Sequence, residues 1–70
     1  MLYFFEKGRS VLQCEVRSTP IRDTFAIVMT DGEGKVRTHY VTGSNDAHRR
    51  WLELEQELAA AGWSGPVGGD

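Results

Sequence analysis

The chain has 70 residues, 40% hydrophobic and 26% charged, which predicts one globular domain and excludes a disordered chain. Eight Lys and Arg residues against ten Asp and Glu residues leave a net charge of −2, which argues against a strongly basic nucleic-acid binder. A folded chain of this length buries about 60% of its surface, and one cysteine excludes an intrachain disulfide, so the expected core is small.

The charge is uneven along the chain. Residues 1–45 hold six basic and five acidic side chains, whereas residues 46–70 hold two basic and five acidic ones, so the first part could present a positive face. The apolar start lacks the basic region of a secretory signal, and no apolar run approaches the ~18 residues of a membrane span. Together with the lone Cys14, these features predict a cytoplasmic protein.

The first element expected is a β-hairpin of residues 2–7 and 10–17, with Gly8-Arg9 at its turn. In the register that this turn sets, Phe5 faces Leu12 and Tyr3 faces Cys14. One face of the hairpin is mostly apolar and should be buried: Tyr3, Phe5, Leu12, Cys14 and Val16. The other face is of mixed polarity: Leu2, Phe4, Glu6, Val11, Gln13, Glu15 and Arg17.

Residues 18–24 contain Pro20 and read as a connection to a second hairpin, residues 25–30 and 35–42. Its tip, residues 31–34, has the sequence Asp-Gly-Glu-Gly. A four-residue loop would pair Met29 with Val36, Ile27 with Thr38 and Phe25 with Tyr40, and we expect these six side chains in the core. The back of this hairpin would then hold Ala26, Val28, Arg37, His39 and Val41.

The spacing of apolar residues from 46 to 61 predicts an amphipathic helix with one stripe: Ala47, Trp51, Leu54, Leu58 and Ala61. Ser44, Asn45 or Asp46 can cap its start, and Gly62 suits the left-handed position after its end, with Trp63 packing back on Leu58. Residues 64–70 read as a flexible Gly-rich tail. The expected fold is therefore α+β, a ββββα domain over residues 1–63 with a four-stranded antiparallel sheet and one helix on one face.

The side chains capable of chemistry form no recognisable site. Cys14 has no partner cysteine and lies on the expected inner face, and His39 and His48 lack the spacing of zinc ligands. Glu53, Glu55 and Glu57 lie on the expected helix, which is exposed. General acid–base catalysis needs two carboxylates in different environments within a cleft, and an exposed helix offers no such cleft. We therefore expect no catalytic residue, no metal and no cofactor; an enzyme would need a site assembled across a dimer interface.

The sheet face that one helix cannot cover is the most informative feature. Its expected interaction residues are Leu2, Phe4, Val11, Arg17, Val28, Arg37, His39 and Val41. So apolar a face in so small a chain favours a non-enzymatic protein-interaction module. Its partner would be a second copy, joined through this face or through paired helices and strand edges, or another protein.

A second hypothesis is single-stranded nucleic-acid binding. Phe4 could stack on bases while Arg17, Arg37 and His39 contact phosphates, although the net charge disfavours it. The ββββα order is similar to that of the Whirly and Pur-repeat single-strand binders, a resemblance of topology that matches no residue motif.

Overall fold

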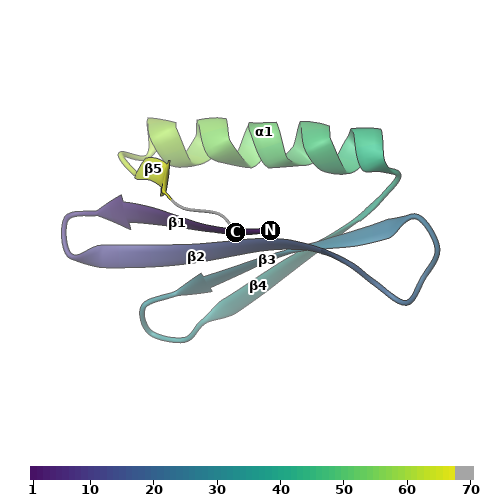
Figure 1. Cartoon of the computed structure of the whole chain (residues 1–70). Helices are drawn as coiled ribbons and strands as arrows, with labels where there is room; N and C mark the ends of the chain where they lie inside the picture. The colour runs from purple at the N-terminus through teal and green to yellow at the C-terminus, as the bar shows by residue number, and fades with distance from the viewer. Residues whose placement is uncertain (68–70) are drawn as a thin grey trace.

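The computed structural model describes residues 1–67. Within that range the chain forms five strands and one helix (Figure 1). In chain order these elements are β1 (Leu2–Lys7), β2 (Ser10–Ser18), β3 (Thr24–Asp31), β4 (Val36–Thr42), α1 (Ser44–Ala60) and β5 (Ser64–Val67).

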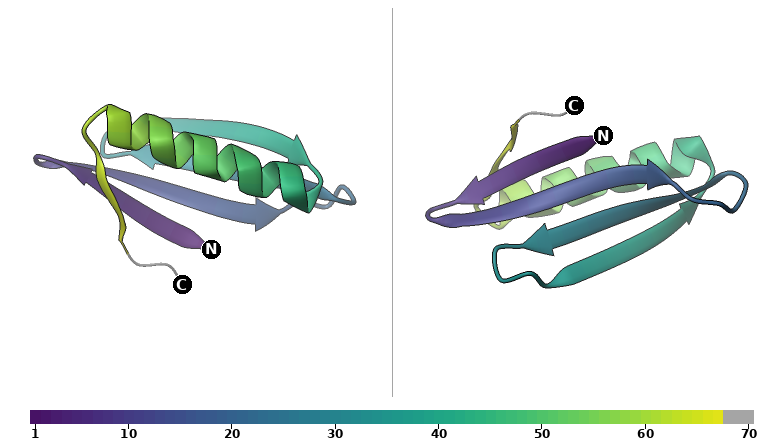
Figure 2. Two further views of the ribbon diagram at one scale, coloured as in Figure 1. Left: turned by 90° about the horizontal axis from the view of Figure 1, so that it is seen from above. Right: turned by 60° about the horizontal axis from the view of Figure 1, so that its bottom comes forward.

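The described strands form a single antiparallel sheet in the order β4-β3-β2-β1-β5. Helix α1 lies across one face of this sheet, as the view from above shows (Figure 2). The predicted α+β class and ββββα order are confirmed, and the sheet has one strand more than expected.

The predicted register of the first hairpin is confirmed. Tyr3 pairs with Cys14 and Phe5 with Leu12, and Gly8 at the turn has a φ of 60°. The turn sequence therefore placed every side chain of β1 and β2 on the correct face, because a glycine adopts this left-handed conformation without steric cost.

The predicted register of the second hairpin is wrong by one residue. Met29 pairs with Arg37, Ile27 with His39 and Phe25 with Val41. Arg37, His39 and Val41 therefore lie on the helix side of the sheet, whereas Val36, Thr38 and Tyr40 lie on the opposite face.

The cause of this shift lies at the hairpin tip. The N–H of Asp31 donates to the carbonyl of Lys35 at 3.0 Å, so the loop holds three residues, Gly32 to Gly34, instead of four. The N–H of Gly34 donates to the carbonyl of Asp31 at 3.0 Å, and Gly34 has a φ of 85°. This is a type I turn followed by a left-handed glycine, the usual three-residue hairpin loop.

Helix α1 begins at Ser44, two residues earlier than predicted, with Gly43 at the N-cap position. No side chain of the described residues caps its first turn; Asp46 lies in that turn and is ion-paired with Arg49. At the other end, Trp63 N–H donates to Leu58 O at 2.9 Å and Gly62 N–H to Ala59 O at 3.0 Å. This is the predicted Schellman motif, with Gly62 at a φ of 96°.

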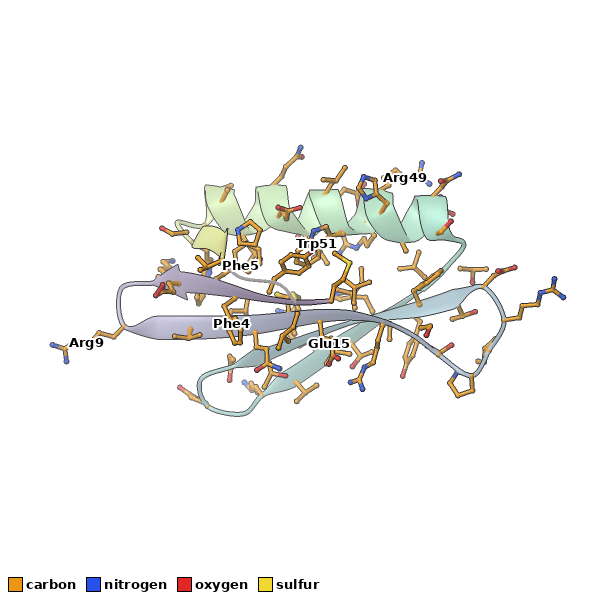
Figure 3. All side chains as sticks on the ribbon, in the orientation of Figure 1. Phe4, Phe5, Arg9, Glu15, Arg49 and Trp51 are labelled. Carbon is orange, nitrogen blue, oxygen red and sulfur yellow. The ribbon has the colours of Figure 1, made fainter. Side chains whose placement is uncertain are left out.

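The core lies between α1 and the sheet. Its buried side chains are Phe5, Cys14, Ile27, Met29 and Leu54, with Tyr3, Leu12, Val16, Val41, Trp51, Leu58 and Trp63 packed around them. Trp51 organises the aromatic part: its ring stacks on Tyr3 with centroids 4.9 Å apart and lies 6.1 Å from the ring of Phe5. Phe5 and Trp51 meet between the layers in Figure 3.

Residues 64–67, predicted to be part of a tail, form β5 along the outer edge of β1. Phe4 pairs with Val67 and Glu6 with Ser64, with an irregularity in the register between them. Gly65 allows this close approach, because a Cβ there would lie 2.8 Å from the carbonyl oxygen of Phe4. Residues 68–70 of the predicted tail lie outside the described residues.

Candidate interaction surface

The sheet face opposite α1, called the open face below, is covered by no other element of residues 1–67. Its side chains follow from the alternation of each strand and from the paired registers. They are Leu2, Phe4 and Glu6 of β1; Val11, Gln13, Glu15 and Arg17 of β2; Ala26, Val28 and Thr30 of β3; and Val36, Thr38 and Tyr40 of β4. Figure 3 shows Phe4 and Glu15 pointing away from the helix.

The open face is ordered in rows across the strands. One row runs Phe4, Gln13, Thr30, Val36; the next runs Leu2, Glu15, Val28, Thr38; a third runs Arg17, Ala26, Tyr40. Because side chains opposite one another on neighbouring strands are in contact range, each row forms a continuous strip.

Exposed apolar side chains are concentrated on this face. Eight large hydrophobic residues are exposed in the described part of the chain, and five of them lie on strands. All five belong to the open face: Phe4, Val11, Val36, Tyr40 and Val67, the last placed there by its pairing with Phe4. Tyr40 is 72% exposed and Val36 is 59% exposed, so the exposure is greatest along β4.

A hollow of about 590 Å³ lies at the end of the open face where β2 joins β3. Pro20 and Ile21 of the connecting loop line one side of it, and Ala26, Val28 and Tyr40 of the sheet line its floor. The loop is held by Thr19, whose hydroxyl donates to the carbonyl of Thr24 at 3.0 Å and accepts from the N–H of Ile21 at 3.2 Å. The hollow is thus formed by an anchored loop.

The charge of the open face is nearly balanced. Its strands carry Glu6, Glu15 and Arg17, and Arg17 lies 3.8 Å from Glu15 in an exposed ion pair. Such a pair contributes little to stability, because water screens it. The face therefore lacks the excess of cations that phosphate contacts need.

The structure brings together five of the eight predicted interaction residues on the open face: Leu2, Phe4, Val11, Arg17 and Val28. The other three, Arg37, His39 and Val41, lie on the helix side because of the register of β4. Arg37 and His39 line a small hollow of about 140 Å³ beside Arg50, which is ion-paired with Glu53 at 3.2 Å and Glu57 at 3.3 Å.

This correction separates the residues of the nucleic-acid hypothesis. Phe4 and Arg17 remain on the open face, whereas Arg37 and His39 lie on the other side of the sheet. The four residues therefore do not form one surface.

Sequence reasoning missed Val36, Thr38, Tyr40, Ile21 and Val67 as surface residues. The glycine at position 34 was the available signal for β4, since a left-handed glycine after a type I turn makes the loop one residue shorter. The sequence carried no comparable signal for Val67, because Gly and Pro surround it and both are rare in strands.

The remaining candidates for a chemical site in the described residues are Cys14, a third hollow and any cluster of metal-ligating side chains. Cys14 is completely buried, and burial raises the pKa of its thiol from 9.0 to about 11, so the thiol stays protonated at neutral pH. A third hollow, of about 200 Å³, lies between the sheet and the first half of α1, lined by Tyr3, Phe25, His48 and Trp51 among others. In the described residues, no three His, Cys, Asp or Glu side chains are grouped closely enough to hold a metal ion.

Among residues 1–67, no helix has both the length and the apolar character needed to cross a membrane. Comparison of the chain with protein-family models, with curated proteins and with solved structures found no match.

Proposed function

We propose that this protein is a non-enzymatic interaction module of the cytoplasm that associates with a second copy of itself through the β4 half of its open face. We define that half by the accessible apolar residues of β3 and β4, Val28, Val36 and Tyr40, together with Ile21 of the adjoining β2–β3 loop. The proposal rests on one observation. Within the described residues, all large hydrophobic side chains that are exposed on strands lie on the same face of the sheet, and the most exposed of them are on β4.

Two physical arguments favour another copy as the partner. A chain of 70 residues has too little volume for a large core, so association that buries further apolar surface has a large relative effect on stability. The open face is also close to neutral, because Glu15 lies beside Arg17, so two copies related by a two-fold axis meet without a strong like-charge repulsion.

The cytoplasmic setting rests on Cys14. The thiol is free and buried, and a protein without a disulfide suits a reducing compartment.

An amide-resolved NMR concentration series tests this function. Between about 10 µM and 1 mM (chosen to span weak dimers of about 10⁻⁵ to 10⁻⁴ M), the amides of β3, β4 and the β2–β3 loop should shift, and those on the outer side of α1 should not. A single-stranded oligonucleotide added at low salt should leave the spectrum unchanged. Shifts on addition of the oligonucleotide, with none on raising the protein concentration, would replace the proposal with the nucleic-acid hypothesis.

A matched pair of variants localises the contact. Tyr40→Lys places a charge at the most exposed apolar strand position, and Leu52→Lys places one on the exposed side of α1, where Leu52 is 44% exposed. We expect the first variant to weaken self-association at least tenfold and the second to leave it unchanged. Equal effects of the two substitutions would mean that the open face is not the contact.

A further inference from the structure

The two edges of the sheet differ in whether a further strand covers them. The β1 edge is covered by β5, a four-residue strand that contains Pro66, whereas β4 is the outermost strand at the other edge (Figure 2). No described segment pairs along the outer side of β4, which runs over seven residues from Val36 to Thr42. An edge of this length presents backbone donors and acceptors to any strand that can align with it.

The register shows which backbone groups face outward. In an antiparallel pair, residues alternate between those that exchange hydrogen bonds with the neighbouring strand and those that do not. Asp31 N–H donates to Lys35 O and Gly43 N–H donates to Asp23 O, so the odd-numbered residues of β4 face β3. The N–H and C=O groups of Val36, Thr38 and Tyr40 therefore point away from the sheet.

The same three residues have exposed side chains on the open face, so one strip combines unpaired backbone groups with apolar surface. We propose that two copies of the chain pair their β4 strands antiparallel about a two-fold axis at Thr38, which joins the two sheets into one continuous sheet. This arrangement rests on the proposed self-association and narrows its contact to the β4 edge of the open face: Val36, Thr38 and Tyr40 of the two copies meet, whereas Val28 on β3 and Ile21 of the loop lie outside the paired strands.

The position of the axis follows from side-chain complementarity. About Thr38, Tyr40 of one copy lies beside Val36 of the other at both ends of the contact, and the two Thr38 residues face each other. Pairs of an aromatic with a β-branched residue and Thr–Thr pairs are both favourable across strands. An axis at Arg37 would place two arginines directly opposite one another, which is unfavourable for the same reason.

Disulfide trapping in the 70-residue chain tests this register. Two residues facing each other in a hydrogen-bonded antiparallel pair have Cα atoms about 5.5 Å apart, within the range that a disulfide spans. Thr38→Cys should therefore form a covalent dimer under mild oxidation. Val36→Cys is the matched control, because the two copies of residue 36 would lie four residues apart along the strands, about 13 Å. The native Cys14 does not interfere, since it is fully buried.

The outcomes separate the register from the function on which it rests. Efficient crosslinking of Thr38→Cys, at least tenfold faster than that of Val36→Cys, together with a dimeric mass for the uncrosslinked protein, is the expected result. A dimeric mass without preferential crosslinking at residue 38 would overturn the β4 pairing and leave self-association standing. A monomeric mass at every concentration would overturn both.

Discussion

Burial alone changes the chemistry of Cys14. The thiol is removed from water by the core, and this raises its pKa from 9.0 to about 11 because the thiolate would be poorly solvated there. Below pH 9 the thiol is protonated in both the folded and the unfolded chain. Between pH 9 and 11 the unfolded chain ionises first, so the free energy of unfolding falls, in total by about 2–3 kcal/mol.

The measurement is urea unfolding at a series of pH values from 8 to 11.5 for the wild type and Cys14→Ala. Tyrosine and lysine side chains also titrate in this range. The difference between the two proteins isolates the thiol: Cys14→Ala should be less stable at pH 8, and the gap should narrow as the pH rises. A gap that stays constant would mean that the folded protein does not keep the thiol protonated.

Gly65 is expected to be intolerant of a side chain. It has a φ of 134°, and an added Cβ would lie 2.8 Å from the carbonyl oxygen of Phe4, so Gly65→Ala should cost about 2 kcal/mol or more through strain and displacement of β5. Gly32→Ala is the control, because the nearest atom to its Cβ is the carbonyl oxygen of Val11 at 3.9 Å. Urea unfolding followed by tryptophan fluorescence compares them, and similar losses would contradict the packing of β5 on β1.

At the scale of the elements, the two hairpins show what the sequence can and cannot specify. The two-residue turn at Gly8 leaves one simple register, so the faces of β1 and β2 were predictable. The tip of the second hairpin contains two glycines, and choosing a four-residue loop over the three-residue one moved every side chain of β4 to the wrong face. The predicted sheet face was therefore correct for the residues of β1, β2 and β3, namely Leu2, Phe4, Val11, Arg17 and Val28, and wrong for the three residues of β4.

The helix could be predicted from sequence and β5 could not, for a related reason. The stripe through Trp51 and Leu54 and the Gly62 stop signal are local patterns, so α1 and its Schellman end could be predicted from sequence. The pairing of β5 with β1 joins segments about sixty residues apart and depends on the close approach of Gly65 to Phe4. No local sequence pattern predicts such a pairing.

The side chain of Asp31 holds the tip of the second hairpin in its three-residue form. Asp31 Oδ1 accepts hydrogen bonds at 2.9 Å from the N–H groups of both Glu33 and Lys35, so the side chain fixes the three-residue loop. Asp31→Ala should lower the free energy of unfolding by about 1–3 kcal/mol, because it removes two hydrogen bonds that contribute roughly 0.5–1.5 kcal/mol each. Glu33→Ala, an exposed neighbour, should change stability by less than about 0.5 kcal/mol in the same unfolding experiment. If the two variants are equally stable, the aspartate does not hold the loop.

At the scale of the whole molecule, one helix on one face of a sheet creates an asymmetry. The helix side holds the buried core, while the open face holds Phe4, Val11, Val36, Tyr40 and Val67 in exposed positions. The sheet edge at β4 adds outward backbone groups beside two of these residues. The chain length predicted a small core, and one helix against a four-stranded sheet predicted an uncovered face. The location of the most exposed apolar strip, however, depended on the register of one hairpin.

The mass of the wild-type protein in solution tests the proposed self-association most directly. Sedimentation equilibrium over a concentration range of about 10 µM to 1 mM (again set by dissociation constants of about 10⁻⁵ to 10⁻⁴ M) should show the mass rising from 7.8 kDa toward twice that value. The rise should move to at least tenfold higher concentration in Tyr40→Lys and stay unchanged in Leu52→Lys. A mass of 7.8 kDa at every concentration would contradict the proposal that the open face and the β4 edge bind a second copy.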